Sequence, residues 1–175
     1  MTNEGKITPR EYGDYKNPNY VYGEMHAPDV AGLLDQSPYA MYTMLDAGSG
    51  CGRLVVELAQ SRPHMTYLCG VELDTYRHSK AQQLWNESDY DIQQKVEFIH
   101  GDFLEQSFAP FDFVYCCNTM FDAELNNKLI NKILKECDHV FVLYTLEPRC
   151  LPYFWKTWKV RTSWMKEVNV YMYCK

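Results

Sequence analysis

Short apolar runs that alternate with helical patterns constrain the fold of this chain more than any other feature of its sequence. The apolar runs, each about as long as one strand, occupy residues 41–45, 66–71, 95–99, 111–117 and 139–146. The helical patterns cover residues 28–34, 53–60, 75–89 and 125–134. Alternation with short connections is typical of a parallel sheet covered by helices on both faces. The sequence therefore predicts an α/β fold.

The end of the chain departs from this alternation. Residues 156–165 and 168–174 are both prone to form strands, and only Lys166 and Glu167 separate them. Because two residues are too few for a helical crossover, the two runs should pair antiparallel at the edge of the sheet. The predicted fold class is a Rossmann-like, mostly parallel seven-stranded sheet with an antiparallel C-terminal hairpin and helices on both faces.

The length and composition suit one domain with a short arm. The chain has 175 residues, of which 46% are hydrophobic. Residues 1–24 are rich in Tyr, Gly, Pro and Asn and predict an irregular N-terminal arm, whereas residues 25–175 form the globular domain. No run is long enough to cross a bilayer, and the first ten residues lack the apolar core of a signal peptide. We therefore expect a soluble protein.

The cysteines and histidines indicate neither a disulfide framework nor a metal site. The seven cysteines are odd in number and form no CxxC pair, and the five histidines are scattered. Reduced thiols suit an intracellular compartment, and the sequence does not distinguish nucleus from cytoplasm.

Positive charge is concentrated near the C-terminus of a chain whose net charge is −6. After residue 148, six Lys or Arg residues accompany one acid, and Trp155, Trp158 and Trp164 lie among them. Two interpretations stay open. The segment is either a solvated face or a patch that makes a weak contact with an acidic partner such as nucleic acid.

Acids and glycines follow the predicted parallel strands, at the edge where α/β sheets bind ligands. The sequence 46–52 reads Asp-Ala-Gly-Ser-Gly-Cys-Gly, and its glycines allow backbone to approach a ligand closely. Glu72 lies 20 residues past Gly52 at the tip of the next strand, where a carboxylate can accept hydrogen bonds from both ribose hydroxyls. These features predict a nucleoside ligand.

The spacing and charge of these residues favour a nucleoside without phosphates. The third glycine comes one residue too early for the dinucleotide pattern, and no phosphate-binding GxxxxGK[ST] loop is present. Asp46, Glu72 and Asp102 would repel a pyrophosphate but suit a ligand that bears an ammonium and a sulfonium. S-adenosylmethionine is such a ligand. Asp46 would orient the loop and the methionine amine, Asp102 would accept from the adenine amino group, and Phe103 would stack on adenine.

The turn after the fourth predicted strand bears on the methyl acceptor. Enzymes that methylate amino groups of bases carry an Asn/Asp-Pro-Pro-aromatic turn here, whereas this chain has Asn118-Thr-Met-Phe121 without prolines. Because methyl transfer is an in-line displacement, the enzyme chiefly aligns the nucleophile and keeps it dry and unprotonated. The turn therefore favours an amine on a flexible side chain over a nucleic-acid base.

Six short motifs together resemble the catalytic domain of the non-SET histone lysine methyltransferases, the disruptor-of-telomeric-silencing (Dot1-like) family. They are Tyr-Gly-Glu at 22–24, the glycine loop at 46–52, Gly-Val-Glu at 70–72, Gly-Asp-Phe at 101–103, the turn at 118–121 and Val-Tyr-Met-Tyr at 170–173. The resemblance covers about residues 19–175. It implies that residues 1–24 serve as an arm and cofactor lid, and that residues 25–175 form a class I methyltransferase catalytic domain.

The resemblance also implies roles for single residues. Those implied to hold S-adenosylmethionine are Tyr22, Gly23, Glu24, Met25, Asp46, Gly48, Gly50, Glu72, Asp102, Phe103 and Asn118. Those implied to line a narrow channel for the acceptor, as catalytic residues, are Asn118, Phe121 and Tyr171. The acceptor would then be a lysine side chain of a protein, with a histone in nucleosomes as the target known in that family.

Two other interpretations of the sequence stay open. One is a class I methyltransferase that acts on a non-histone protein or a small molecule. The other is a module that binds the cofactor or a partner without catalysis. Cofactor binding without turnover on any protein substrate would favour the last.

Overall fold

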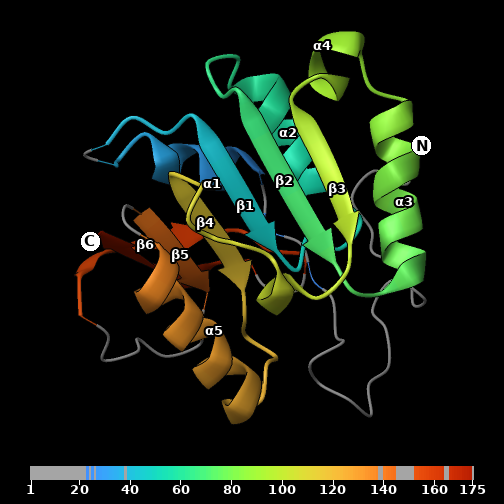
Figure 1. The fold of residues 1–175 in the computed structure, drawn as a ribbon. Coiled ribbons are helices and arrows are strands. Elements are labelled where there is room, and N and C mark those ends of the chain that lie inside the picture. The colour runs from blue at the N-terminus through green and yellow to red at the C-terminus, as the bar shows by residue number, and fades with distance from the viewer. Residues whose placement is uncertain are drawn as a thin grey trace.

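The fold is taken from a computed structural model, which describes residues 23, 25, 27–37, 39–137, 140–144, 152–163 and 166–174. These residues form a central sheet with helices on both sides (Figure 1). Among the described residues, no helix has both the length and the apolar character that a membrane crossing requires.

The sheet is mostly parallel, as the alternation of strands and helices predicts. Its strands are β1 (Thr43–Ala47), β2 (Tyr67–Glu72), β3 (Val96–His100), β4 (Phe113–Cys117), β5 (Val140–Tyr144), β6 (Phe154–Val160) and β7 (Val168–Cys174). Their order is β3-β2-β1-β4-β5-β7-β6. Pairing is parallel from β3 through β5 and antiparallel from β5 to β7 and from β7 to β6. The parallel part is thus smaller than the whole sheet, and the expected antiparallel C-terminal hairpin is confirmed.

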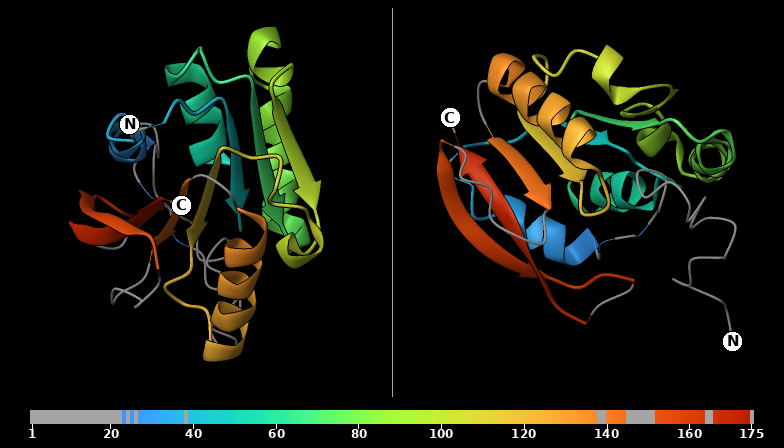
Figure 2. Two further views of the ribbon diagram at one scale, coloured as in Figure 1. Left: turned by 60° about the vertical axis from the view of Figure 1, so that its left-hand side comes forward. Right: turned by 90° about the horizontal axis from the view of Figure 1, so that it is seen from below.

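Helices cover the two faces of the sheet unequally. They are α1 (Ala27–Leu34), α2 (Arg53–Ser61), α3 (Thr75–Asn86), α4 (Tyr90–Gln93) and α5 (Ala123–Glu136), with a 3₁₀ turn at Phe103–Glu105. Figure 2 shows α1 and α2 on one face and α5 on the other. Each face has its own apolar core. Val55, Leu58 and Leu68 belong to the first core, and Leu45, Leu129 and Ile133 belong to the second.

Polar contacts explain where several elements begin and end. The carboxylate of Asp112 accepts hydrogen bonds from the backbone N–H groups of Tyr42 and Thr43 at 2.9 and 3.0 Å, which joins the start of β4 to the start of β1. The N–H of Phe111 bonds to the carbonyl of Phe108 in a turn, so β4 begins at Phe113 instead of residue 111. The helix expected over residues 75–89 ends at Asn86, and α4 follows it.

Candidate active site

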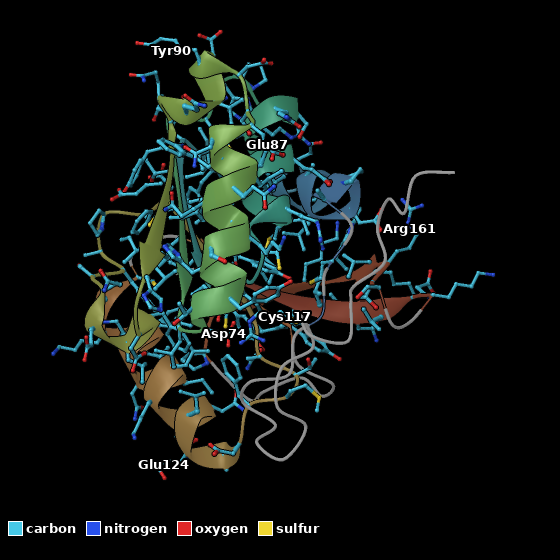
Figure 3. All side chains as sticks on the ribbon, turned by 90° about the vertical axis from the view of Figure 1, so that its right-hand side faces the viewer. Asp74, Glu87, Tyr90, Cys117, Glu124 and Arg161 are labelled. Carbon is cyan, nitrogen blue, oxygen red and sulfur yellow. The ribbon has the colours of Figure 1, made fainter. Side chains whose placement is uncertain are left out.

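The carboxyl ends of β1 to β4 lie at one edge of the sheet, because these strands run parallel (Figure 1). Figure 3 shows Asp74 and Cys117, which lie near the ends of β2 and β4, at that end of the molecule. Glu87 and Tyr90 lie at the opposite end. The expectation that the strand-end residues gather at one edge is confirmed for Asp46, Glu72, Asp102 and Asn118.

The glycine loop needs backbone conformations that other residues avoid. Gly48, Gly50 and Gly52 have φ angles of 95°, 56° and 78°. A Cβ atom on Gly52 would lie 2.5 Å from Phe98, so this glycine lets α2 start tightly against the sheet. A Cβ on Gly48 would meet no atom of the described residues within 4 Å. The backbone at Gly48 therefore faces open space where a ligand can approach.

Glu72 is held in place by the loop and by α3. Its Oε2 accepts from the N–H of Gly50 at 2.9 Å. Its Oε1 accepts from the N–H of Asp74 at 2.8 Å and lies 3.2 Å from the guanidinium of Arg77. Since a carboxylate oxygen accepts about two hydrogen bonds, only Oε2 keeps an open position. Glu72 can accept one ribose hydroxyl as it stands, and a second only if a contact to Oε1 breaks.

Arg77 was not expected from the sequence as part of this site. It is 4% exposed, and its guanidinium lies between Glu72 and Asp74, the residue that caps α3. The sequence signal for Arg77 is a basic residue in the first turn of the helix that follows the strand-end acid Glu72. A buried guanidinium beside a carboxylate fixes the orientation of that carboxylate.

Asp46 is a buried acid beside the loop. Burial, and to a smaller extent the charge of Glu72, raise the pKa of Asp46 to about 8. Asp46 is 3% exposed, and its neighbours across the sheet are Gly70 and Tyr115. An ammonium group at this position would stabilise the ionised carboxylate. This chemistry fits the methionine amine of S-adenosylmethionine.

Several buried polar atoms have no hydrogen-bond partner within the described part of the chain, and one lies in the glycine loop and another directly after β4. These two are Oγ of Ser49 and Oδ1 of Asn118. Buried polar groups in proteins nearly always have partners, so such atoms point to a bound ligand or water. The sequence predicts a role for Asn118, whereas Ser49 is predicted only as part of the glycine loop.

One polar group of the Asn118 side-chain amide, the oxygen Oδ1, has no hydrogen-bond partner among the described residues. Its Nδ2 donates to Oδ1 of Asn126 at 2.5 Å, and its residue exposure is 1%. Oδ1 is therefore the Asn118 atom without a partner that could serve either expected role, cofactor binding or contact with the acceptor. Asn126, on α5, was not expected from the sequence.

Phe103 and Phe121 stack on each other, with ring centroids 5.9 Å apart and planes 12° apart. Asp102, just before, caps the 3₁₀ turn by accepting from the N–H of Leu104 at 2.8 Å. Phe121 was expected in the acceptor channel and Phe103 on adenine. The structure thus brings together the aromatic side chains that follow β3 and β4.

Tyr171 lies on β7, opposite Leu143 of β5, which in turn pairs with Cys116 of β4. Two strand spacings therefore separate Tyr171 from β4, about 10 Å in all. Its ring is 6% exposed and contacts Phe154, with centroids 6.4 Å apart. The backbones of Asn118 and Tyr171 are therefore separated by the width of β5.

Only part of the expected cofactor lid falls within the described residues. Tyr22 and Glu24 lie outside them, whereas Gly23 and Met25 are described. Met25 is buried, forms a bridge with Thr162, and its sulfur contacts the hydroxyl of Tyr115. Because Tyr115 pairs with Asp46 across the sheet, Met25 lies on the same face as the buried acid.

The thiol of Cys117, next to Asn118, is not a nucleophile at neutral pH. Burial raises its pKa to about 12, although contacts with Thr119 partly oppose this effect. The described residues also hold no group of three or more His, Cys, Asp or Glu side chains placed to bind a metal.

The fold and the site define a class. A parallel sheet of this strand order, a glycine loop without a phosphate-binding motif, and acids at the strand ends are the features of class I, S-adenosylmethionine-binding enzymes. The chain belongs to the methyltransferase domain family, whose model matches residues 44–142. The protein is an S-adenosylmethionine-dependent methyltransferase. The residues described above include a glycine loop, a carboxylate at the end of β2 and a buried acid, which the sequence predicts to hold this cofactor.

Solved structures of similar fold come from enzymes with different substrates. One is an RNA methyltransferase from Salinibacter ruber in complex with S-adenosyl-L-homocysteine, with 21% identity, a TM-score of 0.65, and coverage of 85% of this chain and 88% of that one. Another is magnesium protoporphyrin IX methyltransferase from Synechocystis PCC 6803 with bound cofactor, with 16% identity, a TM-score of 0.66, and coverage of 85% and 77%. A third is a glycopeptide N-methyltransferase complexed with the cofactor, with 16% identity, a TM-score of 0.55, and coverage of 83% and 64%.

No curated protein matches the chain. The resemblance to the non-SET histone lysine methyltransferases is not supported by these comparisons. Its motifs at 46–52, 70–72 and 101–103 form the cofactor edge of the sheet, which class I enzymes share. The more specific motif at 22–24 lies mostly outside the described residues.

Proposed function

We propose that this chain transfers a methyl group from S-adenosylmethionine to an amine nitrogen of a small molecule or a non-histone protein. The observation that carries this proposal is the buried, unpartnered Oδ1 of Asn118 at the end of β4. An amide oxygen can only accept, so the group that it faces must donate. Leaving this oxygen without a partner would cost about 1–3 kcal/mol.

A nitrogen acceptor fits this site better than other nucleophiles. A carboxylate or thiolate has no hydrogen to donate and would face the amide oxygen unfavourably. An alcohol has one, but it needs a base to become a good nucleophile, and the neighbouring Cys117 thiol has its pKa raised to about 12. A neutral amine can donate one N–H to Asn118 and still present its lone pair.

The chain's own residues would orient and enclose the reactants. When bound, the cofactor supplies a methyl group on a sulfonium, which is transferred by in-line displacement. Gly50 and Arg77 hold Glu72 toward the ribose, and Asp46 offers its charge to the methionine amine. Asn118 would align the nitrogen.

The charge of the chain supports a substrate other than a nucleosome. Arg161 makes a two-point ion pair with Asp29 at 2.9 Å, and Lys159 lies 2.6 Å from Glu167. Lys156 bonds to Gln36 at 3.1 Å. Three of the basic C-terminal side chains therefore have partners within the chain, and contacts to phosphate would compete with them. A lysine side chain of another protein remains one member of the proposed class of amines.

A screen with tritiated S-adenosylmethionine tests this proposal. The acceptors would be a panel of small primary and secondary amines, matched alcohols and carboxylic acids, lysate proteins, free histones and nucleosomes. We expect label on amines or on lysine residues of lysate proteins. Label confined to alcohols or carboxylates would contradict the amine, and a strong preference for nucleosomes would restore the histone interpretation.

A further inference from the structure

Both the oxygen and the nitrogen of the Asn126 side-chain amide make hydrogen bonds. It lies in the first turn of α5, one turn after the capping residue Asp122, and is 2% exposed. Its Nδ2 donates to the carbonyl oxygens of Phe121 and Asp122 at 2.7 and 3.0 Å. Its Oδ1 accepts from Nδ2 of Asn118 at 2.5 Å.

These contacts fix the orientation of both amides. Backbone carbonyls only accept, so the NH₂ group of Asn126 must face them. Its oxygen must then face Asn118, whose own NH₂ group donates a hydrogen bond to it. Among the described residues, Oδ1 of Asn118 is the oxygen or nitrogen of the two amides that has no hydrogen-bond partner.

We propose that Asn126 is a positioning residue for methyl transfer: it orients the Asn118 amide so that an oxygen, and not an NH₂ group, faces the methyl acceptor. The link to an acceptor rests on the proposed function. The amide relay itself, from the backbone of the β4–α5 turn through Asn126 to Asn118, rests only on the contacts above.

The opposite orientation is disfavoured at two places. If the Asn118 amide turned over, its oxygen would face the oxygen of Asn126, and a hydrogen bond between buried groups would become a repulsion. If both amides turned over, the oxygen of Asn126 would face the two backbone carbonyls. The relay therefore selects acceptors that donate a hydrogen and disfavours carboxylates and thiolates.

Nuclear magnetic resonance can test the relay without any acceptor. In the full chain labelled with ¹⁵N and ¹³C and saturated with S-adenosyl-L-homocysteine, we expect a coupling through the hydrogen bond from Nδ2 of Asn118 to Cγ of Asn126. A coupling in the reverse direction, from Nδ2 of Asn126 to Cγ of Asn118, would overturn the proposal. Absence of both couplings, with rapid solvent exchange of the Asn118 NH₂ group, would also overturn it.

A kinetic test uses Asn126→Asp with Asn127→Asp as the matched control, since Asn127 is the exposed neighbour on the same helix. The introduced carboxyl can replace the asparagine when protonated, because it then both donates to a carbonyl and accepts from Asn118. When ionised it has no hydrogen for the carbonyl oxygens of Phe121 and Asp122, and their repulsion would move it away from its position beside Asn118. With n-butylamine as acceptor, kcat/KM of Asn126→Asp relative to the unmutated protein should fall by about tenfold or more as pH rises from 6 to 9.

The controls separate positioning from simple structural damage. Asn126→Ala should lower kcat/KM by a factor that does not change with pH, and Asn127→Asp should match the unmutated protein at every pH. Affinity for S-adenosyl-L-homocysteine should stay within about twofold for all three variants. Equal turnover by Asn126→Asp at pH 9, or a loss of cofactor affinity that parallels the loss of turnover, would refute a positioning role. No turnover of any amine by the unmutated protein would refute the proposed function, while the coupling experiment would still decide the relay.

Discussion

At the scale of single residues, the site consists of buried polar groups whose partners are partly supplied by the fold. Both carboxylate oxygens of Glu72 already have partners in the loop and at the start of α3, whereas Asp46 is buried and its pKa is raised. Desolvation makes the ionised form of Asp46 costly until a cation lies beside it. The bound cofactor, which carries an ammonium group, would lower this cost.

Cofactor affinity should therefore depend on pH through Asp46. Below a pKa of about 8 the free protein holds a proton on Asp46, and binding the ammonium releases it. Affinity gained from Asp46 should rise with pH up to about 8, by no more than about tenfold per pH unit. Calorimetry from pH 6 to 9 on the unmutated protein and on Asp46→Asn measures this gain. The gain is the dissociation constant of Asp46→Asn divided by that of the unmutated protein, and this ratio should rise with pH.

The ratio isolates Asp46, because the amine of the cofactor titrates in the same way for both proteins. A ratio that stays constant across this range would mean that Asp46 does not meet the ammonium group. A ratio that falls with pH would contradict the sign of the effect.

At the scale of elements, the sequence predicted types and order well but predicted contacts between elements poorly. The alternation of patterns identifies the parallel strands because a buried parallel strand is a short apolar run whatever its neighbours are. Asp112, just before β4, bonds to Tyr42 and Thr43, which are about seventy residues away in the chain. No local pattern carries such a contact.

In the candidate site, too, the sequence predicts the positions of residues better than the contacts between them. Asp46, Glu72, Asp102 and Asn118 follow strands, so the sequence could place them at one edge. Arg77 and Asn126 lie on helices, and their importance comes from what they touch across the fold. The stacking of Phe103 on Phe121 likewise depends on how the turn after β4 folds back toward the end of β3.

The glycine loop gives a prediction at this scale. Gly52→Ala places a methyl group 2.5 Å from Phe98 at a φ of 78°, whereas Gly48→Ala meets nothing within 4 Å at a φ of 95°. Both changes strain the backbone, by about 1–3 kcal/mol each, and Gly52→Ala adds overpacking of about the same size. Urea denaturation should find Gly52→Ala the less stable of the two.

The same pair separates stability from binding. Gly48→Ala should weaken S-adenosyl-L-homocysteine binding more than its effect on stability explains, because the added methyl occupies the open space at the loop. Equal stability of the two variants would mean that α2 can move away from Phe98. Unchanged cofactor affinity in Gly48→Ala would mean that the cofactor does not approach this glycine.

At the scale of the whole molecule, net charge and charge pairing limit the partners of the protein. The chain carries a net charge of −6. Arg161 joins the end of β6 to Asp29 on α1, and Lys159 joins Glu167. The segment that looks basic in the sequence thus uses several of its charges within the domain. Lys166 is exposed, and Arg149 and Lys175 lie outside the described residues.

We therefore expect weak binding to nucleic acid. Fluorescence anisotropy with a labelled RNA hairpin and a DNA duplex should give dissociation constants of about 10⁻⁴ M or weaker at physiological salt, which is the non-specific range. The double variant Lys156→Glu/Lys159→Glu should change neither these values nor their dependence on salt. Micromolar binding that weakens steeply with salt and is lost in the double variant would show instead that the segment recruits a polyanion.

The central claim is that Asn118 aligns an amine nitrogen for methyl transfer, and Asn118→Ala measures it most directly. The variant removes one hydrogen bond to a buried acceptor atom, and turnover of the amine found in the acceptor screen should fall by about ten- to a hundredfold in kcat/KM. Affinity for S-adenosyl-L-homocysteine should stay within about twofold of the unmutated protein. Unchanged kcat/KM, or a loss of cofactor affinity that accounts for the whole loss of turnover, would contradict the claim.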